Sequence, residues 1–220
     1  AMSRVVDGGG FFQIQPDFGP SIVCALARVG GHAVGVVANQ PAVIAGSIDV
    51  DAADKAAHFV QVCDSFHLPL VFMTDNPGVL AGTASERAGI LRAGARMFTA
   101  QTRARTVKIQ VTMRKAYGFG SCVMAMNGYD EQTLSYAFPG ATMGAMGSQG
   151  AGNAVGADDD TRAALREAEL ESSYRSAAGL GFDELIDPRD LRNAILDGLT
   201  LSARRRAGAA EPVARIGITP

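Results

Sequence analysis

The sequence has few of the side chains on which enzymes usually rely for acid–base or nucleophilic chemistry. Its 220 residues include three histidines and three cysteines. The cysteines, Cys24, Cys63 and Cys122, are widely spaced and form neither a disulfide framework nor a zinc motif. This cysteine usage indicates a reducing compartment, so we expect a cytoplasmic protein.

An excess of positive charge is also missing. The chain has 20 Lys and Arg against 22 Asp and Glu, a formal net charge of −2. Proteins that bind nucleic acid or acidic membranes need a basic surface, so we expect neither partner. No apolar stretch approaches the roughly 20 residues of a membrane helix, and residues 1–7 lack the pattern of a signal peptide.

Glycine, in contrast, is abundant. The 26 glycines are about 12% of the chain, against a usual value of about 7%. They follow no period and lie beside apolar runs, and the length suits one domain over residues 1–220. Ala1 before Met2 is typical of a cloning remnant. We therefore expect residues 1–10 to be a leader, either left by cloning or flexible, and the chain to be part of a longer protein.

Apolar patterning predicts alternating strands and helices. The runs 21–29 and 32–39 flank Gly30-Gly31 and predict a β-hairpin. A helix should follow, with Asp51 and Asp54 at its cap and first turn. Further strands are expected at 70–73, 106–112, 134–138 and 142–146, and further helices at 90–98, 121–126, 158–174 and 187–206. The pattern indicates an α/β fold with short, partly parallel strands.

Most of the acidic and cysteine side chains are explained by structural roles, as helix caps or core residues, rather than by catalysis or metal binding. The acidic clusters stand where helices begin, and no histidine accompanies them at ligand spacing. Cys24 and Cys63 lie on apolar faces and are expected in the core. Cys122 differs because it follows a glycine turn at a predicted helix start, where a thiolate would be stabilised. The Gly-x-Ser-x-Gly and Walker motifs are absent.

Three glycine-containing loops carry more information. They span 75–83, 114–120 and 144–151, and each follows a predicted strand and precedes a predicted helix. Glycine lets a ligand approach the main chain, and a helix N-terminus offers unpaired N–H donors. Such donors suit the oxyanion of an enolate or a thioester carbonyl, although each loop taken alone could be only a tight turn.

At these loops the sequence resembles a known family. The matching segments, which run in family order within about 11–187, are 35–41, 59–66, 77–83, 114–118 and 145–147. They are similar to the C-terminal half of the carboxyltransferase (beta) subunit of biotin-dependent acyl-CoA carboxylases, of the propionyl-CoA carboxylase beta type. The resemblance implies a crotonase-like (ClpP/crotonase) fold of stacked strand–strand–helix units.

The resemblance also implies a reaction and its partners. In that family an N-terminal half mainly carries acyl-CoA, while the C-terminal half receives carboxybiotin from a carrier domain. CO2 passes to the α carbon of the acyl-CoA, and biotin itself acts as the base, with no metal in this domain. The implied partners are the N-terminal half, biotin carboxylase, the biotin carboxyl carrier subunit and further copies of the chain in a homo-oligomer.

The family pattern assigns roles to particular residues. Backbone N–H groups of Gly118, Phe119 and Gly120 would be catalytic. The residues implied to bind biotin are Pro77, Gly78, Val79, Tyr117, Gly118, Phe119 and Gly120, and those implied to line the acyl pocket are Cys122, Ala145, Met146 and Gly147. Two positions depart from the pattern: Phe119 replaces a glycine, and Cys122 replaces an acidic residue. We therefore expect a change in backbone geometry or pocket volume at Phe119, and the replacement at Cys122 argues against a preference for short polar acyl groups.

Two other functions stay open at this point. A crotonase-like hydratase or decarboxylase could act on acyl-CoA without biotin, although the sequence offers no paired glutamates for hydration. Alternatively, the chain could be a catalytically silent half that only builds an oligomer. The second alternative would be favoured if the side chain of Phe119 blocked the biotin channel.

Overall fold

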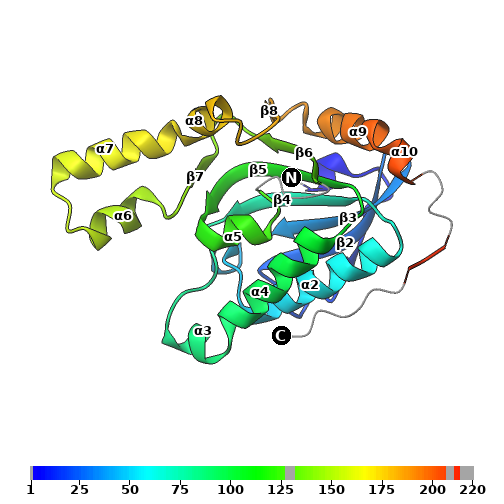
Figure 1. Ribbon diagram of the computed structural model, residues 1–220, viewed down its shortest axis with the longest axis horizontal. Coiled ribbons are helices and arrows are strands. Elements are labelled where there is room, and N and C mark those ends of the chain that lie inside the picture. The colour runs from blue at the N-terminus through cyan, green and yellow to red at the C-terminus, as the bar shows by residue number, and fades with distance from the viewer. Residues whose placement is uncertain (1, 127–131, 207–210, 214–220) are drawn as a thin grey trace.

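A mixed eight-stranded sheet forms the centre of the molecule (Figure 1). The structure, a computed structural model, describes residues 2–126, 132–206 and 211–213. The strand order is β1-β2-β3-β4-β5-β6-β8, and β7 pairs with the end of β5. The strands are β1 Phe11–Ile14, β2 Ile22–Val29, β3 His32–Asn39, β4 Leu70–Asn76, β5 Lys108–Tyr117, β6 Gln132–Ala137, β7 Thr142–Gly144 and β8 Glu184–Leu185.

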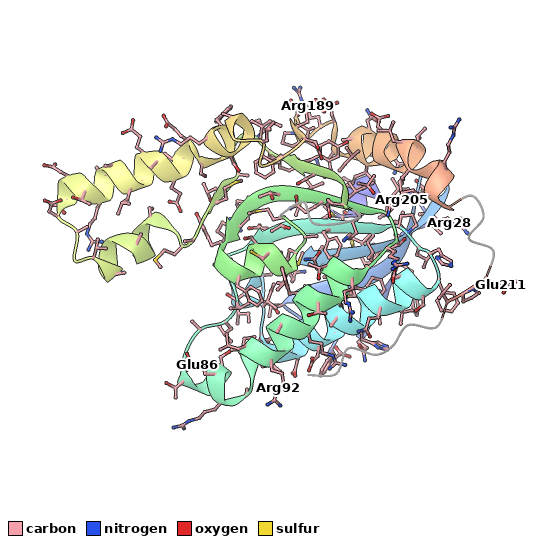
Figure 2. All side chains as sticks on the ribbon, in the orientation of Figure 1. Arg28, Glu86, Arg92, Arg189, Arg205 and Glu211 are labelled. Carbon is pink, nitrogen blue, oxygen red and sulfur yellow. The ribbon has the colours of Figure 1, made fainter. Side chains whose placement is uncertain are left out.

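Helices cover both faces of this sheet. They are α1 Met2–Val5, α2 Val50–Ser65, α3 Thr83–Arg87, α4 Ile90–Arg103, α5 Gly118–Val123, α6 Ser148–Ala154, α7 Asp159–Leu170, α8 Ser172–Ala178, α9 Leu191–Leu201 and α10 Ala203–Arg206, with a 3-10 turn η1 at Ile44–Gly46. One core cluster packs α2 and α4 against the sheet, and another packs α9 against its opposite face. Figure 2 shows Glu86 and Arg92 on the α3 and α4 side and Arg189 on the other.

The hairpin predicted around Gly30-Gly31 is confirmed. β2 and β3 pair antiparallel, and the two glycines take φ values of 57° and 80°, which a turn of this kind requires. With α2 they form a strand–strand–helix unit. From β3 onward, β3, β4, β5 and β6 pair in parallel. β4 is buried along its whole length, as expected for a continuous apolar strand between helical layers.

The predicted helix after the hairpin is present, but its cap lies two residues earlier than the expected Asp51. Asp49 is the N-cap, and its Oδ1 accepts a hydrogen bond of 2.9 Å from the N–H of Ala52. Asp54 instead pairs with Arg96 of α4 at 3.1 Å. The last helix also differs: Pro188 lies outside it, because α9 begins at Leu191.

Cys24 and Cys63 lie in the core, as predicted. Both are fully buried between the sheet and α2. Burial raises the pKa of each thiol to about 12, so both are protonated at neutral pH. Neither cysteine therefore offers a thiolate for chemistry.

The N-terminal segment is not a loose leader over its described residues 2–10. Val5 and Val6 are buried beneath α9. The Asp7 carboxylate accepts hydrogen bonds of 2.8 Å from the N–H groups of both hairpin glycines and one of 2.6 Å from Arg192. These long-range contacts, rather than local composition, order residues 2–10.

The helices α6 and α7 lie side by side in an arm that extends beyond the sheet (Figure 1). No residue of α7 is buried. The helix begins as predicted, because the Asp158 carboxylate caps the N–H of Thr161 at 2.9 Å. Among the described residues, no helix is both long and apolar enough to cross a membrane.

Candidate active site

The carboxyl ends of β4, β5 and β7 meet at one edge of the sheet. Asn76 at the end of β4 is in register with Ala116 of β5, and Tyr117 of β5 is in register with Gly144 of β7. Because these strands are parallel, the loops that follow them leave the sheet at the same place. These are the three glycine-containing loops singled out in the sequence.

The loops are in direct contact at their glycines. A Cβ built on Gly120 would lie 2.6 Å from the Cα of Gly78, and one built on Gly118 would lie 2.9 Å from the carbonyl oxygen of Ala145. Gly118 also takes φ +52°, a conformation that favours glycine. The start of α5 is therefore held between the Pro77–Val79 segment and the Ala145–Gly147 segment.

Two buried asparagines fix this junction. The Asn76 side-chain amide donates to Asn39 Oδ1 at 3.1 Å and to the Gly120 carbonyl at 3.4 Å, and its Oδ1 accepts from the Gly78 N–H at 2.9 Å. Asn39 Oδ1 also accepts from the Asp75 N–H at 3.0 Å. The sequence analysis gave neither asparagine a role. Their position at the ends of apolar strands, where a polar side chain must find partners, was the available signal.

The segment 117–120, predicted as a turn before a helix, is the beginning of the helix itself. Tyr117 is the N-cap of α5, and no side chain caps this end. The N–H groups of the first helical turn have no acceptor within the helix and carry a partial positive charge. Main-chain donors of Gly118, Phe119 and Gly120 can therefore face an anionic oxygen.

The opposing Pro77–Val79 segment forms a wall of the candidate site but offers it few hydrogen-bond donors. Proline has no N–H, and the N–H of Gly78 is bonded to Asn76. The Gly78 carbonyl accepts from the Ile48 N–H at 3.1 Å, and Val79 pairs with Ile48 in a short parallel bridge. The segment is thus held rigidly beside the first turn of α5.

The ring of Phe119 lies over α4. Its centroid is 5.8 Å from that of Phe98, and a Cβ built on Gly94 would lie 2.8 Å from the Phe119 ring. The ring is 37% exposed. Phe119 therefore packs on the neighbouring helix, and Gly118 and Gly120 on either side of it have no side chain to cover the donors.

Cys122 occupies a different place from the one expected. It lies in the last turn of α5, with Sγ 3.7 Å from the Gly118 carbonyl oxygen. The sequence placed Cys122 near the start of a helix at 121–126, whereas α5 begins three residues earlier, at Gly118. Its backbone carbonyl accepts from the Gln101 side chain of α4 at 3.1 Å.

A carboxylate from the arm reaches the same region. Glu169 of α7 accepts hydrogen bonds from the Tyr117 hydroxyl and from Ser148, whose Oγ lies 2.5 Å from Glu169 Oε2. Although burial alone would raise it, these bonds hold the pKa of Glu169 below its usual value. Burial and the bond to Glu169 raise the pKa of Tyr117 to about 12. The sequence analysis did not single out Glu169, because no local pattern places it near Tyr117.

Beside this carboxylate is a cavity of about 670 Å³. Its lining residues are Lys115, Tyr117, Gly147, Ser148, Gln149, Arg162, Arg166 and Glu169. Gly147, predicted in the acyl pocket, thus lies in its wall, while the side chain of the adjacent Met146 is half exposed. Among the described residues, no three His, Cys, Asp or Glu side chains gather in a way that could hold a metal ion.

This convergence of glycine loops agrees with the comparison to known proteins. The carboxyl transferase domain matches residues 1–213. The chain belongs to the carboxyl transferase domain family. The α/β, crotonase-like expectation and the resemblance noted in the sequence are therefore confirmed.

Individual relatives show how much of the family architecture the chain covers. The 12S subunit of methylmalonyl-CoA carboxyltransferase from Propionibacterium freudenreichii subsp. shermanii is 40% identical over 218 aligned positions, and the match covers 93% of this chain and 41% of that subunit. The carboxyltransferase subunit of propionyl-CoA carboxylase from Haloferax mediterranei is 40% identical, over 93% of this chain and 42% of that subunit.

A solved structure gives the same result in three dimensions. Transcarboxylase 12S, a hexamer with hydrolysed methylmalonyl-CoA bound, matches with a TM-score of 0.86 and 39% identity. The match covers 100% of this chain and 44% of that one. The chain therefore spans about two fifths of the length of the carboxyltransferases that it resembles.

Proposed function

We propose that the chain is the C-terminal carboxyltransferase half of a biotin-dependent acyl-CoA carboxylase. In this function it receives a carboxyl group from carboxybiotin and transfers it to the α carbon of an acyl-CoA. The observation that carries the proposal is the meeting of the three glycine loops around the first turn of α5. Main-chain donors suit a reaction in which negative charge develops on carbonyl oxygens.

Biotin fits the residues at this junction. The N–H groups of Gly118, Phe119 and Gly120 would donate to its ureido oxygen, with Pro77, Gly78, Val79 and Tyr117 forming the surrounding wall. Neither glycine carries a side chain, and the Phe119 ring is turned onto α4, so the turn does not cover its own donors. When bound, carboxybiotin supplies the carboxyl group and the base that removes the α proton of the acyl group.

The acyl group would lie on the side of Cys122, Ala145, Met146 and Gly147. Gly147 stands in the wall of the cavity next to Tyr117, and the Ala145 carbonyl touches Gly118. A cysteine in place of the acidic residue of the family makes this pocket less polar, which favours an apolar acyl chain.

The same function implies partners outside this chain. Because the relatives are more than twice as long, we propose an N-terminal half that binds acyl-CoA, together with biotin carboxylase and a biotin carboxyl carrier. A homo-oligomer is consistent with the exposed apolar side chains of Phe12, Phe66 and Leu91, which are 58–70% exposed. We place the assembly in the cytoplasm.

The packing of Phe119 favours an active half over a silent one. The silent alternative required the ring to block the biotin channel, whereas the ring packs against Gly94 and Phe98.

Reconstitution tests the proposal. The chain is mixed with an N-terminal carboxyltransferase half, carboxylated carrier and acyl-CoA, and malonyl-type product is measured by mass spectrometry. We expect product that avidin abolishes and that the Gly140→Ala control retains, because a Cβ on Gly140 meets nothing within 4 Å. Turnover of acyl-CoA that avidin does not affect would instead support the biotin-independent alternative, and no malonyl-type product from folded halves would refute the proposal.

A further inference from the structure

The arm formed by α6 and α7 is joined to the candidate site by one side chain. Glu169 lies in the last turn of α7, at the end nearest the sheet (Figure 1). It is only partly exposed, whereas its neighbour Glu167 is exposed. Its carboxylate points back toward the end of β5 and the start of α6, as its hydrogen bonds show.

The contacts of this carboxylate connect two of the three glycine loops. Oε1 accepts from the Tyr117 hydroxyl and from the Ser148 N–H at 3.2 Å, while Oε2 accepts from Ser148 Oγ at 2.5 Å. The Tyr117 hydroxyl also lies 2.8 Å from Thr142 Oγ1 of β7. Gly147 fits closely between the two partners, since a Cβ there would lie 3.3 Å from Glu169 Oε1 and 3.6 Å from the Tyr117 ring.

Tyr117 is also the N-cap residue of α5, and its backbone leads directly into Gly118. No side chain caps this helix end, so the orientation of its first N–H groups depends on how the residue before them is held. The ring of Tyr117 is buried, and its hydroxyl is the polar end that Glu169 binds.

We propose that Glu169 is a positioning residue: by binding the Tyr117 hydroxyl and Ser148 together, it orients the first-turn N–H groups of α5. This inference rests on the proposed function, because those N–H groups are the proposed oxyanion donors. The proposal gives the projecting arm a role in the reaction, because the Glu169 carboxylate belongs to α7 of the arm. Misplacing reacting or stabilising groups by about 1 Å can reduce a rate by on the order of 100-fold.

Three variants separate this role from a general loss of stability. Glu169→Leu keeps the approximate volume and removes both acceptors. Glu169→Gln keeps an oxygen for Tyr117 and can donate its amide to Ser148 Oγ, so it should rescue. Glu167→Leu places the same substitution on the exposed face of the same helix and serves as the matched control.

Hydrogen exchange of the chain itself gives the first readout. In Glu169→Leu we expect amide exchange to be about tenfold faster at Ser148, whose N–H loses its acceptor, and at residues 122–124, whose N–H groups bond back into α5, with the core strand β4 unchanged and the other two variants close to wild type. Unchanged exchange at residues 122–124 in folded Glu169→Leu would overturn the proposal. If that variant unfolds, Tyr117→Phe, which removes only the hydroxyl, decides the question by the same criterion.

Steady-state kinetics of the reconstituted assembly give the second readout. Donor positioning predicts that Glu169→Leu lowers kcat at least about tenfold, leaves the KM for acyl-CoA within about twofold and is rescued by Glu169→Gln. An unchanged kcat, or an equal loss in Glu167→Leu, would refute the role. If the wild-type assembly forms no product, the proposed function fails, while the exchange data still decide whether Glu169 orders the turn.

Discussion

Gly120 and Gly78 are packed main chain against main chain: a Cβ on Gly120 would lie 2.6 Å from the Gly78 Cα and 2.4 Å from the Asn76 amide oxygen. Real Cβ atoms do not approach backbone this closely, so the contact exists only because Gly120 has no side chain. This contact brings the loop after β4 against the helix after β5. It is the central feature of the candidate site.

The first prediction follows from this contact. Gly120→Ala must push α5 away from the Pro77–Val79 segment, which should lower the free energy of unfolding by about 1–3 kcal/mol and abolish carboxyl transfer. Urea denaturation and the product assay measure the two effects. Gly140→Ala, at a position where a Cβ meets nothing within 4 Å, should change neither. A fully active Gly120→Ala would contradict the assignment of the site.

A second prediction concerns the buried asparagines. Asn76→Ala leaves the buried Gly78 N–H without its acceptor and removes one of the two donors to Asn39 Oδ1. Each buried group left without a partner costs roughly 1–3 kcal/mol, so we expect a large loss of stability and faster amide exchange at Gly78. Calorimetry and hydrogen exchange measure these. A loss below about 1 kcal/mol would mean that the network does not hold the loop.

The third prediction tests where the Phe119 ring lies. Phe119→Ala should cost about 1 kcal/mol or slightly more, because the ring is partly exposed but stacks on Phe98. In a double-mutant cycle with Phe98→Ala, the coupling should be about 0.5–1.5 kcal/mol. Additive effects would show that the rings do not pack together in solution.

Acid stability provides a fourth prediction. Bonds from Arg192 and from the N–H groups of Gly31 and Gly30 lower the pKa of Asp7 from 3.8 to about 2. Because the folded pKa lies below the unfolded one, this stabilisation is present above about pH 4 and disappears as the pH falls toward about 2. Asp7→Asn should therefore have a lower melting temperature than wild type at pH 7, and the difference between the two melting temperatures should be smaller at pH 2. A difference independent of pH would contradict this.

The fifth prediction is spectroscopic. The pKa of Tyr117 is about 12, raised by burial and by Glu169, so its contribution to stability is present below about pH 10 and is lost as the pH rises toward about 12. In Glu169→Gln the negative neighbour is gone, and Tyr117 should ionise at a lower pH. Absorbance titration measures this, with Tyr136, whose pKa is also about 12, as the internal reference. An unchanged titration would contradict the contact.

Local sequence patterns predicted which helices and strands are present better than they predicted where each one begins and ends. The Gly30-Gly31 hairpin, the buried β4 and the helix beginning after Asp158 follow directly from apolar spacing and turn chemistry. The start of α5 was misplaced because two glycines in the Tyr117–Gly120 stretch look like a turn, whereas helical packing against α4 and Gly78 determines their conformation. The packing of residues 2–10 was likewise not readable from local composition, since Arg192, far away in the sequence, binds Asp7.

The sequence by itself determined the α/β alternation and the position of the three glycine loops, because these depend on residue types at short spacing, and its resemblance to known carboxyltransferases indicated the family. Only the tertiary structure decided what the loops touch. Parallel pairing of β4, β5 and β7 brings their ends to one edge, and contact of Gly120 with Gly78 then closes the junction. The roles of Asn39, Asn76 and Glu169 depend on contacts with residues 21 or more positions away, and short-range spacing carries no record of such contacts.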